Sequence, residues 1–235
     1  RASLGLYLPP GVLPPPKFAR DLEGHVTIKT PAGTYARYTL DGSDPTNESP
    51  LYATPIPMPT GGVINAQNFP LTPDKNAADT GNTIARTQFG LAKAKWKIVG
   101  SSSQDGSEGD PSKAIDDNPR TIWHTRYRDG VDPMPHQVTV DLGEEVTIHG
   151  FIYAPRQDMW DGGIIMQARF EVSGDGKNWT VAADNVDFDN IVNSRQQQVV
   201  DLPARIEARY FRLTALRTAN DNDVASAAEI SVLVQ

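Results

Sequence analysis

The sequence contains no cysteine among its 235 residues. Disulfide bridges, thiolate metal sites and cysteine nucleophiles are therefore excluded. No apolar run approaches the ~20 residues that a membrane-spanning helix needs. Positive charge is also in the minority, with 22 Lys and Arg against 29 Asp and Glu and a net charge of −7. This balance argues against nucleic acid or an anionic membrane surface as a general partner.

A secretory leader is a further feature that we do not find at the start of the chain. The segment RASLGLYLPP has no basic start followed by an apolar core. We therefore expect any export signal to lie upstream of Arg1. The lack of cysteine fits a bacterial protein, cytosolic or exported, better than a small animal extracellular module.

Proline is concentrated in the first part of the chain, where residues 1–90 hold 13 of the 19 prolines. The motif LPPGVLPPPK predicts an extended, polyproline-like lead segment over residues 1–18. The turn-rich remainder, residues 19–90, contains short alternating runs and a loop-rich stretch, FPLTPDKNAADTGNT. We predict a small all-β sandwich over residues 19–90.

Two runs in this first part show strand periodicity. HVTIKT places Val26 and Ile28 on one face. YARYTLDG places Ala36, Tyr38 and Leu40 on one face and ends in an Asp-Gly turn. A period of two indicates a strand with one buried face.

Strand-like segments separated by turns fill the rest of the chain. They are QVTVDLG, VTIHGFIYA, ARFEVSGDGKNWTVA, RYFRLTAL and AEISVLV. SGDGKNW predicts a hairpin, because Gly and Asn accept positive φ. No window carries a sustained helical period. We therefore predict an all-β chain of two β-sandwich domains, the second covering residues 91–235.

Several blocks in the second part resemble a known family. PSKAIDDNPRTIWHT, VTVDLG, GFIYAPRQD, FEVSGDGKNWT, ARYFRLTAL and AAEISV follow the order of the discoidin, or F5/8 type C, domain. Within it the chain is similar to the carbohydrate-binding modules of family 32 and to the N-terminal domain of galactose oxidase. The resemblance implies a jelly-roll sandwich without catalytic activity. RYTLDGSDPT and SPLY are similar to the C-terminal domains of chitobiase and β-hexosaminidase, which occur behind exo-glycosidases such as α-L-fucosidases.

The polar loop KAIDDNPRT is a candidate cation site. Its spacing alone favours an Asx-turn with Thr121 bonded to its own backbone, although Ca²⁺ takes roughly six to eight oxygens of these kinds. The family resemblance implies a structural calcium ion that ties this loop to the last strand. The implied ligands are the carboxylates of Asp116 and Glu229, both oxygens of Thr121, and the carbonyls of Lys113, Asn118 and Ala228.

The segment RTIWHTRYRDG, residues 120–130, is a candidate binding or catalytic cluster. Catalysis would need a nucleophile with its base, or two carboxylates aimed at one point. No serine nucleophile motif lies near His124, and the four histidines show no zinc spacing. The copper chemistry of a galactose oxidase catalytic domain is not implied, because the resemblance does not include that domain. We predict that this chain is not an enzyme.

A neutral ligand with many hydroxyls suits these side chains better. Arg and His read hydroxyl groups, and an aromatic face packs on sugar C–H bonds. The predicted sugar-binding residues are His124, Arg126, Tyr127, Arg156, Trp160, Asp161 and Asn220. His124, Tyr127 and Arg156 match positions of the family's galactose binders. Asp161 stands where those binders have asparagine.

Structural interpretations compete with these assignments. Trp123 is expected in the core. Arg126 is as well explained by a surface ion pair of little energetic weight, and Arg156 by a pair with Asp158. Trp160 lies beside DGG with little core to join, so an exposed platform is expected.

Three functional classes remain open. The first, which we predict, is a non-catalytic fragment of a secreted bacterial glycoside hydrolase that binds terminal galactose or N-acetylgalactosamine weakly. Its catalytic domain would lie upstream, and the protein would be secreted, periplasmic or on the cell surface. The second is a surface lectin or adhesin. The third is a lipid-binding discoidin domain, for which only Met159–Trp160 offers an apolar loop tip.

Overall fold

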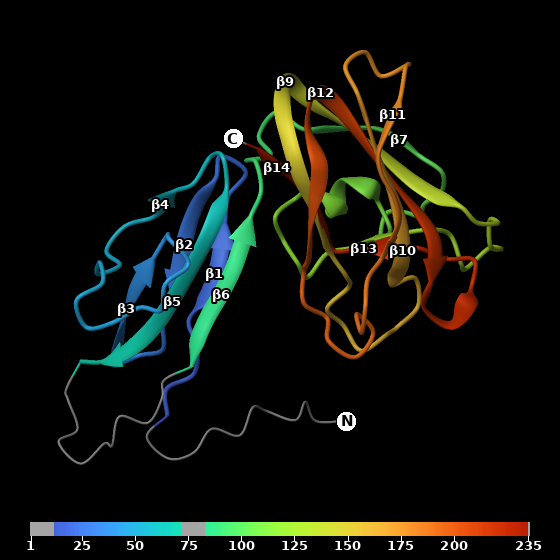
Figure 1. Ribbon diagram of the computed structural model, residues 1–235. Helices are drawn as coiled ribbons and strands as arrows, with labels where there is room; N and C mark the ends of the chain where they lie inside the picture. Colours follow the sequence, from blue (N-terminus) through green and yellow to red (C-terminus); the bar gives the residue numbers. More distant parts are fainter. Residues whose placement is uncertain (1–11, 72–82, 235) are drawn as a thin grey trace. The chain divides into compact units, whose positions relative to one another are not determined.

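The computed structural model describes residues 12–71 and 83–234 (Figure 1). The chain folds as two separate units. The first comprises the chain up to Asp21, His25–Met58 and Gly62–Phe89. The second comprises Gly90–Gln235 with the short segments Leu22–Gly24 and Pro59–Gly61. Strands dominate both units, so the predicted all-β fold class is confirmed.

The first unit is a small sandwich of two antiparallel sheets. One sheet, in the order β1-β2-β4, contains β1 (Lys17–Arg20), β2 (His25–Lys29) and β4 (Ile56–Pro57). The other, in the order β3-β5-β6, contains β3 (Thr34–Thr39), β5 (Gly62–Pro70) and β6 (Ile84–Phe89). Val26 and Ile28 are buried with Ile64 and Ala66, so the alternation in HVTIKT marks a strand with an inward face.

One periodicity prediction for this unit is wrong. Leu40 is 49% exposed, because β3 ends at Thr39 and the turn at Asp41 and Gly42 begins at once. Most of the predicted lead segment and most of the stretch FPLTPDKNAADTGNT lie outside the described residues.

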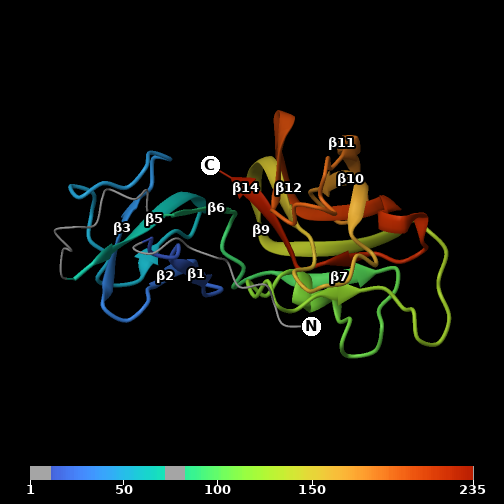
Figure 2. The same ribbon diagram turned by 90° about the horizontal axis from the view of Figure 1, so that it is seen from below.

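Two long strands organise the second unit. The strands are β7 (Lys97–Ser101), β8 (Trp123–His124), β9 (His136–Ala154), β10 (Ile165–Ser173), β11 (Thr180–Asp187), β12 (Gln198–Thr218), β13 (Ser226–Ala227) and β14 (Glu229–Val234). β9 and β12 pair along most of their length. One half of β9 also pairs with β7, and the other half pairs with β14. β10 and β11 continue the sheet beyond β12 (Figure 2).

Aromatic rings form the centre of the hydrophobic core of the second unit. Phe151 and Phe170 stack with ring centroids 4.4 Å apart, and Phe211 lies 5.6 Å from Phe170. Trp96 meets Phe211 edge-on, and Trp123 is fully buried, as predicted. Truncating a buried ring of this size to alanine costs about 3–5 kcal/mol, so this cluster is a main source of the unit's stability.

The segment SGDGKNW forms the predicted hairpin between β10 and β11. Asp175 accepts backbone hydrogen bonds from Lys177 and Asn178, and these bonds lower the pKa of its carboxyl. Gly176 supplies the positive φ of the turn, at 71°. Trp179 ends the hairpin with the Arg212 guanidinium 4.4 Å above its ring.

Helix is scarce in the described part of the chain. The 3-10 turns η1 (Pro111–Ala114) and η2 (Ala219–Asp221) are short, in agreement with the missing helical period. No helix among the described residues is long and apolar enough to cross a membrane.

Candidate functional site: a loop surface and a buried cation cluster

Backbone pairing fixes the position of His124. His124 in β8 lies opposite Ser226 in β13, and the backbone N of the next residue, Thr125, donates to the Ala225 carbonyl at 2.9 Å. A Cβ at Gly109 would lie 2.3 Å from the His124 carbonyl oxygen, so only glycine allows the 105–109 turn to approach so closely. The side chain of His124 is therefore held on a rigid backbone.

The hydrogen bond of His124 determines its tautomer. Nδ1 lies 2.5 Å from the Thr125 carbonyl oxygen, which can only accept, so Nδ1 carries the proton. Burial lowers the pKa of His124, and the nearby Arg156 charge lowers it further, although Thr125, Asp105 and Asp158 oppose the shift. The ring is therefore neutral at pH 7, and Nε2 presents a lone pair.

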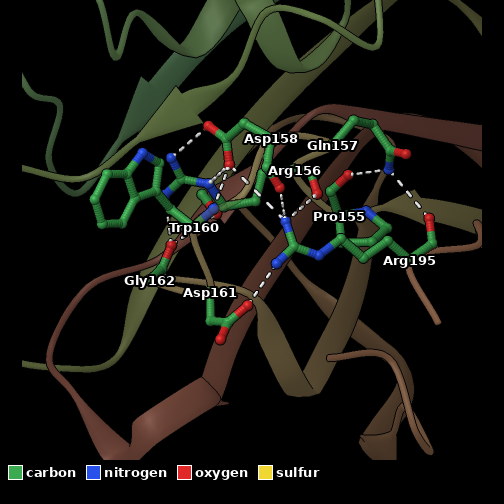
Figure 3. A network of polar contacts seen from close by, with 9 residues as sticks. Pro155, Arg156, Gln157, Asp158, Trp160, Asp161, Gly162 and Arg195 are labelled. Atoms are coloured by element: carbon green, nitrogen blue, oxygen red, sulfur yellow. Dashed lines mark hydrogen bonds and ion pairs between the residues drawn. The ribbon is translucent and has the colours of Figure 1, made fainter. Parts of the chain in front are cut away.

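Arg156 organises the loop that follows β9 (Figure 3). Its Nε and Nη2 donate to the two oxygens of Asp158 at 2.8 and 2.7 Å, and Nη1 donates to the Gly162 carbonyl at 2.7 Å. Although burial raises the pKa of Asp158, hydrogen bonds from Arg156 and from the backbone N of Trp160 produce a net lowering. The pairing with Asp158 considered from sequence therefore exists, and it shapes this loop.

Exposed aromatic and apolar side chains border these groups in sequence. Trp160 is 65% exposed and Met159 is 74% exposed, as expected for a platform on this loop. Tyr127 is half exposed, and its ring meets the His124 ring edge-on at 4.9 Å. The surface thus offers an aromatic face beside hydrogen-bonding groups, the combination that sugar recognition uses.

Two predicted sugar-binding residues are tied less closely to this surface. Arg126 forms an exposed ion pair with Asp132, which matches its structural interpretation. Asn220 is exposed in η2 with φ 64°, and it forms no hydrogen bond to another predicted sugar-binding residue in the described part of the chain.

Arg195, which lies between β11 and β12, was not among the residues predicted from the sequence. Its guanidinium contacts the carboxylate of Asp161 and the carbonyl of Asp158 (Figure 3). A run such as NSRQQQ carries no local signal of this pairing, because the partner lies 34 residues away in sequence.

The loop that follows η1 adopts the Asx-turn that its spacing favours. Asp116 accepts a hydrogen bond from the Asn118 backbone N at 2.9 Å, and Thr121 Oγ1 donates to the other oxygen of Asp116 at 2.8 Å. Thr121 Oγ1 also lies 2.8 Å from the Asn118 carbonyl. Three of the implied calcium ligands are thus gathered in one turn.

Glu229 faces this turn from the start of β14. Burial raises the pKa of Glu229 to about 8, and Asp117 and Asp116 add to the shift while Lys93 opposes it. Oε2 accepts from the Lys93 ammonium, whereas the buried Oε1 has no hydrogen-bond partner in the described part of the chain. The chemistry of this donor set, a buried carboxylate oxygen next to Asp116, fits a cation.

Lys93 is a buried cation that sequence reasoning missed. Its side chain is fully buried and contacts Asp117 at 3.1 Å as well as Glu229. The carboxylates of Asp116, Asp117 and Glu229 carry three negative charges if ionised, and Lys93 cancels one. The remaining charge of −2 matches a divalent ion.

A metal centre built from three or more acidic, imidazole or thiol side chains is a different kind of site from the cluster around Glu229. Among residues 12–71 and 83–234, no group of three or more His, Cys, Asp or Glu could hold a metal. In the cluster around Glu229, Asp117 is paired with Lys93, and the carboxylates of Asp116 and Glu229 lie with hydroxyl and carbonyl oxygens. These are the ligands of a hard cation such as Ca²⁺ rather than of a transition metal.

Two families match the chain. The F5/8 type C domain family matches residues 97–230, and the chitobiase/beta-hexosaminidase C-terminal domain family matches residues 19–76. Galactose oxidase of Gibberella zeae is 33% identical over 143 residues, which are 60% of this chain and 20% of that protein. A sialidase of Micromonospora viridifaciens is 29% identical over 218 residues, 91% of this chain and 28% of the sialidase. The chain therefore spans less than a third of either relative.

Solved structures give the same picture for the second unit. A family 32 carbohydrate-binding module of Clostridium perfringens, in complex with GalNAc-β-1,3-galactose, is 30% identical with a TM-score of 0.53; the match covers 60% of this chain and 97% of that one. The C-terminal domain of a chitobiase from Bacteroides fragilis is 28% identical with a TM-score of 0.55, covering 62% and 97%. The predicted discoidin sandwich is confirmed.

Proposed function

The chain belongs to the F5/8 type C domain family, and on that premise we propose that its second unit binds terminal galactose-type sugars through the surface around His124, Arg156 and Trp160. Both units are of carbohydrate-binding and accessory types rather than catalytic ones. One observation carries the proposal: a neutral imidazole acceptor, a guanidinium and an exposed indole lie on neighbouring loops.

The chemistry of galactose fits these three groups. Its axial 4-hydroxyl leaves an apolar C–H patch on one ring face, on which the Trp160 indole packs. His124 Nε2 accepts from a sugar hydroxyl, and an N–H of Arg156 that remains free for a ligand donates to a sugar oxygen. The complex of the Clostridium perfringens module with a GalNAc-galactose disaccharide supports this class of ligand. Such shallow contact gives dissociation constants of roughly 0.1–1 mM, or about −4 to −5.5 kcal/mol.

We further propose that the cluster around Glu229 holds a structural calcium ion. Asp116 and Glu229 would supply carboxylates, Thr121 its hydroxyl and carbonyl, and Lys113, Asn118 and Ala228 their carbonyls. The ion supplies positive charge to buried oxygens and no reaction chemistry. The residues that would hold the ion connect the loop at Asp116 to β14, the last strand.

The biological setting is a proposal of the same kind. We propose that this chain is an accessory segment of a secreted bacterial glycoside hydrolase, with the catalytic domain upstream. Weak binding is sufficient for that role, because a tethered module raises the local concentration of the enzyme on a glycan surface. The match of residues 19–76 to a domain of chitobiase and β-hexosaminidase supports this setting over a lectin.

Titration of the intact chain tests the sugar proposal. Galactose, N-acetylgalactosamine, fucose and glucose are added to the wild type, His124→Ala and the control His25→Ala, whose histidine is exposed in the first unit. We expect the wild type and the control to bind galactose or N-acetylgalactosamine. His124→Ala should lose this binding, while its melting temperature stays within a few degrees of that of the wild type. A wild type that binds glucose as tightly as galactose, or a His124→Ala variant that binds galactose as the wild type does, would contradict the proposal.

Arg156→Ala is a less specific test than His124→Ala. The Arg156 guanidinium holds Asp158 and the Gly162 carbonyl. Its removal therefore disorganises the loop as well as the ligand contact, and a loss of sugar binding would have two causes.

A further inference from the structure

Arg195 joins the segment between β11 and β12 to the Arg156 loop through several contacts. Nη2 donates to Asp161 Oδ1 and Nη1 donates to the Asp158 carbonyl, while the Arg195 carbonyl accepts from Gln157 Nε2 at 3.1 Å (Figure 3). Its side chain is only 20% exposed. Because one planar guanidinium serves both partners, the position of Asp161 depends on Arg195.

The geometry leaves Asp161 with one free acceptor. Oδ1 is taken by Arg195, whereas Oδ2 makes no hydrogen bond in the described part of the chain, and 44% of the side chain is exposed. An ionised carboxylate can only accept. Asp161 precedes Gly162, whose carbonyl is held by Arg156, so this acceptor lies on the loop proposed to contact the sugar.

The formal charges of the Arg156 loop and of Arg195 cancel. Arg156 and Arg195 carry two positive charges, and Asp158 and Asp161 carry two negative charges, while His124 is neutral. Removal of Arg195 alone would leave a partly exposed carboxylate without its counter-charge. Such a carboxylate attracts a cation in the ligand.

From this balance we infer that Arg195 determines ligand specificity, cancelling the charge of Asp161 so that the surface takes neutral sugars in preference to cationic amino sugars. The inference rests on the proposed sugar-binding function. Asp161 then acts as a hydrogen-bond acceptor for a hydroxyl group rather than as an anion that recruits an amine.

The test compares two sugars that differ in charge at one position. Galactose and galactosamine are titrated by NMR at about pH 6.5, where a primary amine is protonated, into the intact chain and its variants. The measured quantity is the ratio of the galactosamine dissociation constant to the galactose dissociation constant. Arg217→Gln is the matched control, because Arg217 forms an exposed ion pair with Asp187 on the sheet.

We expect Arg195→Gln to lower this ratio by about 3- to 10-fold at low ionic strength, with a smaller change in high salt. Arg195→Lys keeps the positive charge and should leave the ratio close to that of the wild type. Asp161→Asn should raise the ratio, since Arg195 is then the uncompensated charge. The control Arg217→Gln should behave as the wild type.

An unchanged ratio in Arg195→Gln, with galactose still bound, would overturn the inference and leave the proposed function standing. An equal loss of both sugars in Arg195→Gln would also overturn it, since Arg195 would then only position the loop. If Arg195→Gln does not fold, Asp161→Asn decides, because a ratio that does not rise contradicts the charge balance. A wild type that binds neither sugar would refute the proposed function and this inference together.

Discussion

The two candidate sites of the second unit use the same kinds of side chain in opposite ways. On the loop surface, Arg156 and Arg195 are paired with Asp158 and Asp161, and the side chains of both carboxylates are 44–45% exposed. In the cluster around Glu229 the Lys93 side chain is fully buried, and Glu229 Oε1 lacks a partner in the described part of the chain.

This difference shows how burial decides what a charged group does. On the loop surface the carboxylates are partly exposed, although the Arg156 side chain is only 9% exposed. A carboxylate that still reaches solvent keeps an oxygen available to a ligand. A buried charge without a partner is costly, so it either changes its protonation state or recruits a cation. The first arrangement suits reversible binding, and the second suits a permanent structural ion. Four measurements test whether the two sites differ in this way.

The largest expected effect is on stability, from Glu229→Ala. This change leaves Lys93 buried with Asp117 as its remaining partner, and breaking a buried pair in this way costs about 3–5 kcal/mol. Chemical denaturation followed by tryptophan fluorescence measures the loss. The control Glu207→Ala, at an exposed position in β12, should stay within about 0.5 kcal/mol of the wild type.

The second prediction concerns calcium and Asp116. Calcium at ~100 times its dissociation constant should stabilise the wild type by about 2.7 kcal/mol relative to EDTA, because it binds the folded state alone. Asp116→Asn should lose most of this difference, whereas Asp189→Asn, an exposed control, should keep it. A wild type that contains no metal by elemental analysis and gains no stability with calcium would refute the calcium proposal.

A smaller effect is expected from Trp160→Ala. Loss of the stacking ring should weaken galactose binding by about tenfold and change the unfolding free energy by less than about 0.5 kcal/mol. Val181→Ala removes an exposed apolar side chain from β11 and serves as control. If both variants bind galactose as the wild type does, the indole is not the platform.

The smallest expected effect is a pH dependence of sugar affinity. The pKa of His124 is lowered by burial and by Arg156, with Asp105 and Asp158 opposing, so the neutral ring that accepts at Nε2 persists above pH ~6.5. As pH falls through the lowered pKa, Nε2 becomes a donor, and affinity should fall about two- to fivefold once the pH lies below that pKa. NMR titration at each pH measures this. Affinity that rises on acidification would mean that His124 donates to the ligand.

Local patterns predicted the features that depend on neighbouring residues. The alternation of Val26 and Ile28, the hairpin SGDGKNW and the burial of Trp123 follow from side-chain period and turn preference. Leu40 shows the limit of such patterns, because the end of a strand depends on the following turn.

The partners that define both sites could not be predicted from local patterns. Lys93 meets Glu229 across 136 residues, and Arg195 meets Asp161 across 34, so neither pairing leaves a local period. Asp116 and Glu229 were placed together only because the resemblance to a known family implied it. The pairing of Lys93 with Glu229 depends on the long-range contact between the chain at Leu91 and β14, where Leu91 N donates to the Val232 carbonyl.

The pairing of Lys93 with Glu229 also has a mechanical consequence. Leu91 donates to the Val232 carbonyl at 2.9 Å, and a Cβ at Gly90 would lie 2.4 Å from that same oxygen. Gly90 and Leu91 are therefore fastened along β14, the last strand of the second unit. A load that pulls Gly90 away from Val234 would meet the Leu91–Val232 bond first and the buried Lys93–Glu229 pair after it, because the two segments run antiparallel and open from that end. The loops of His124 and Arg156 begin where this load path ends, because Glu229 pairs with Ala154 just before the Arg156 loop and Ser226 pairs with His124.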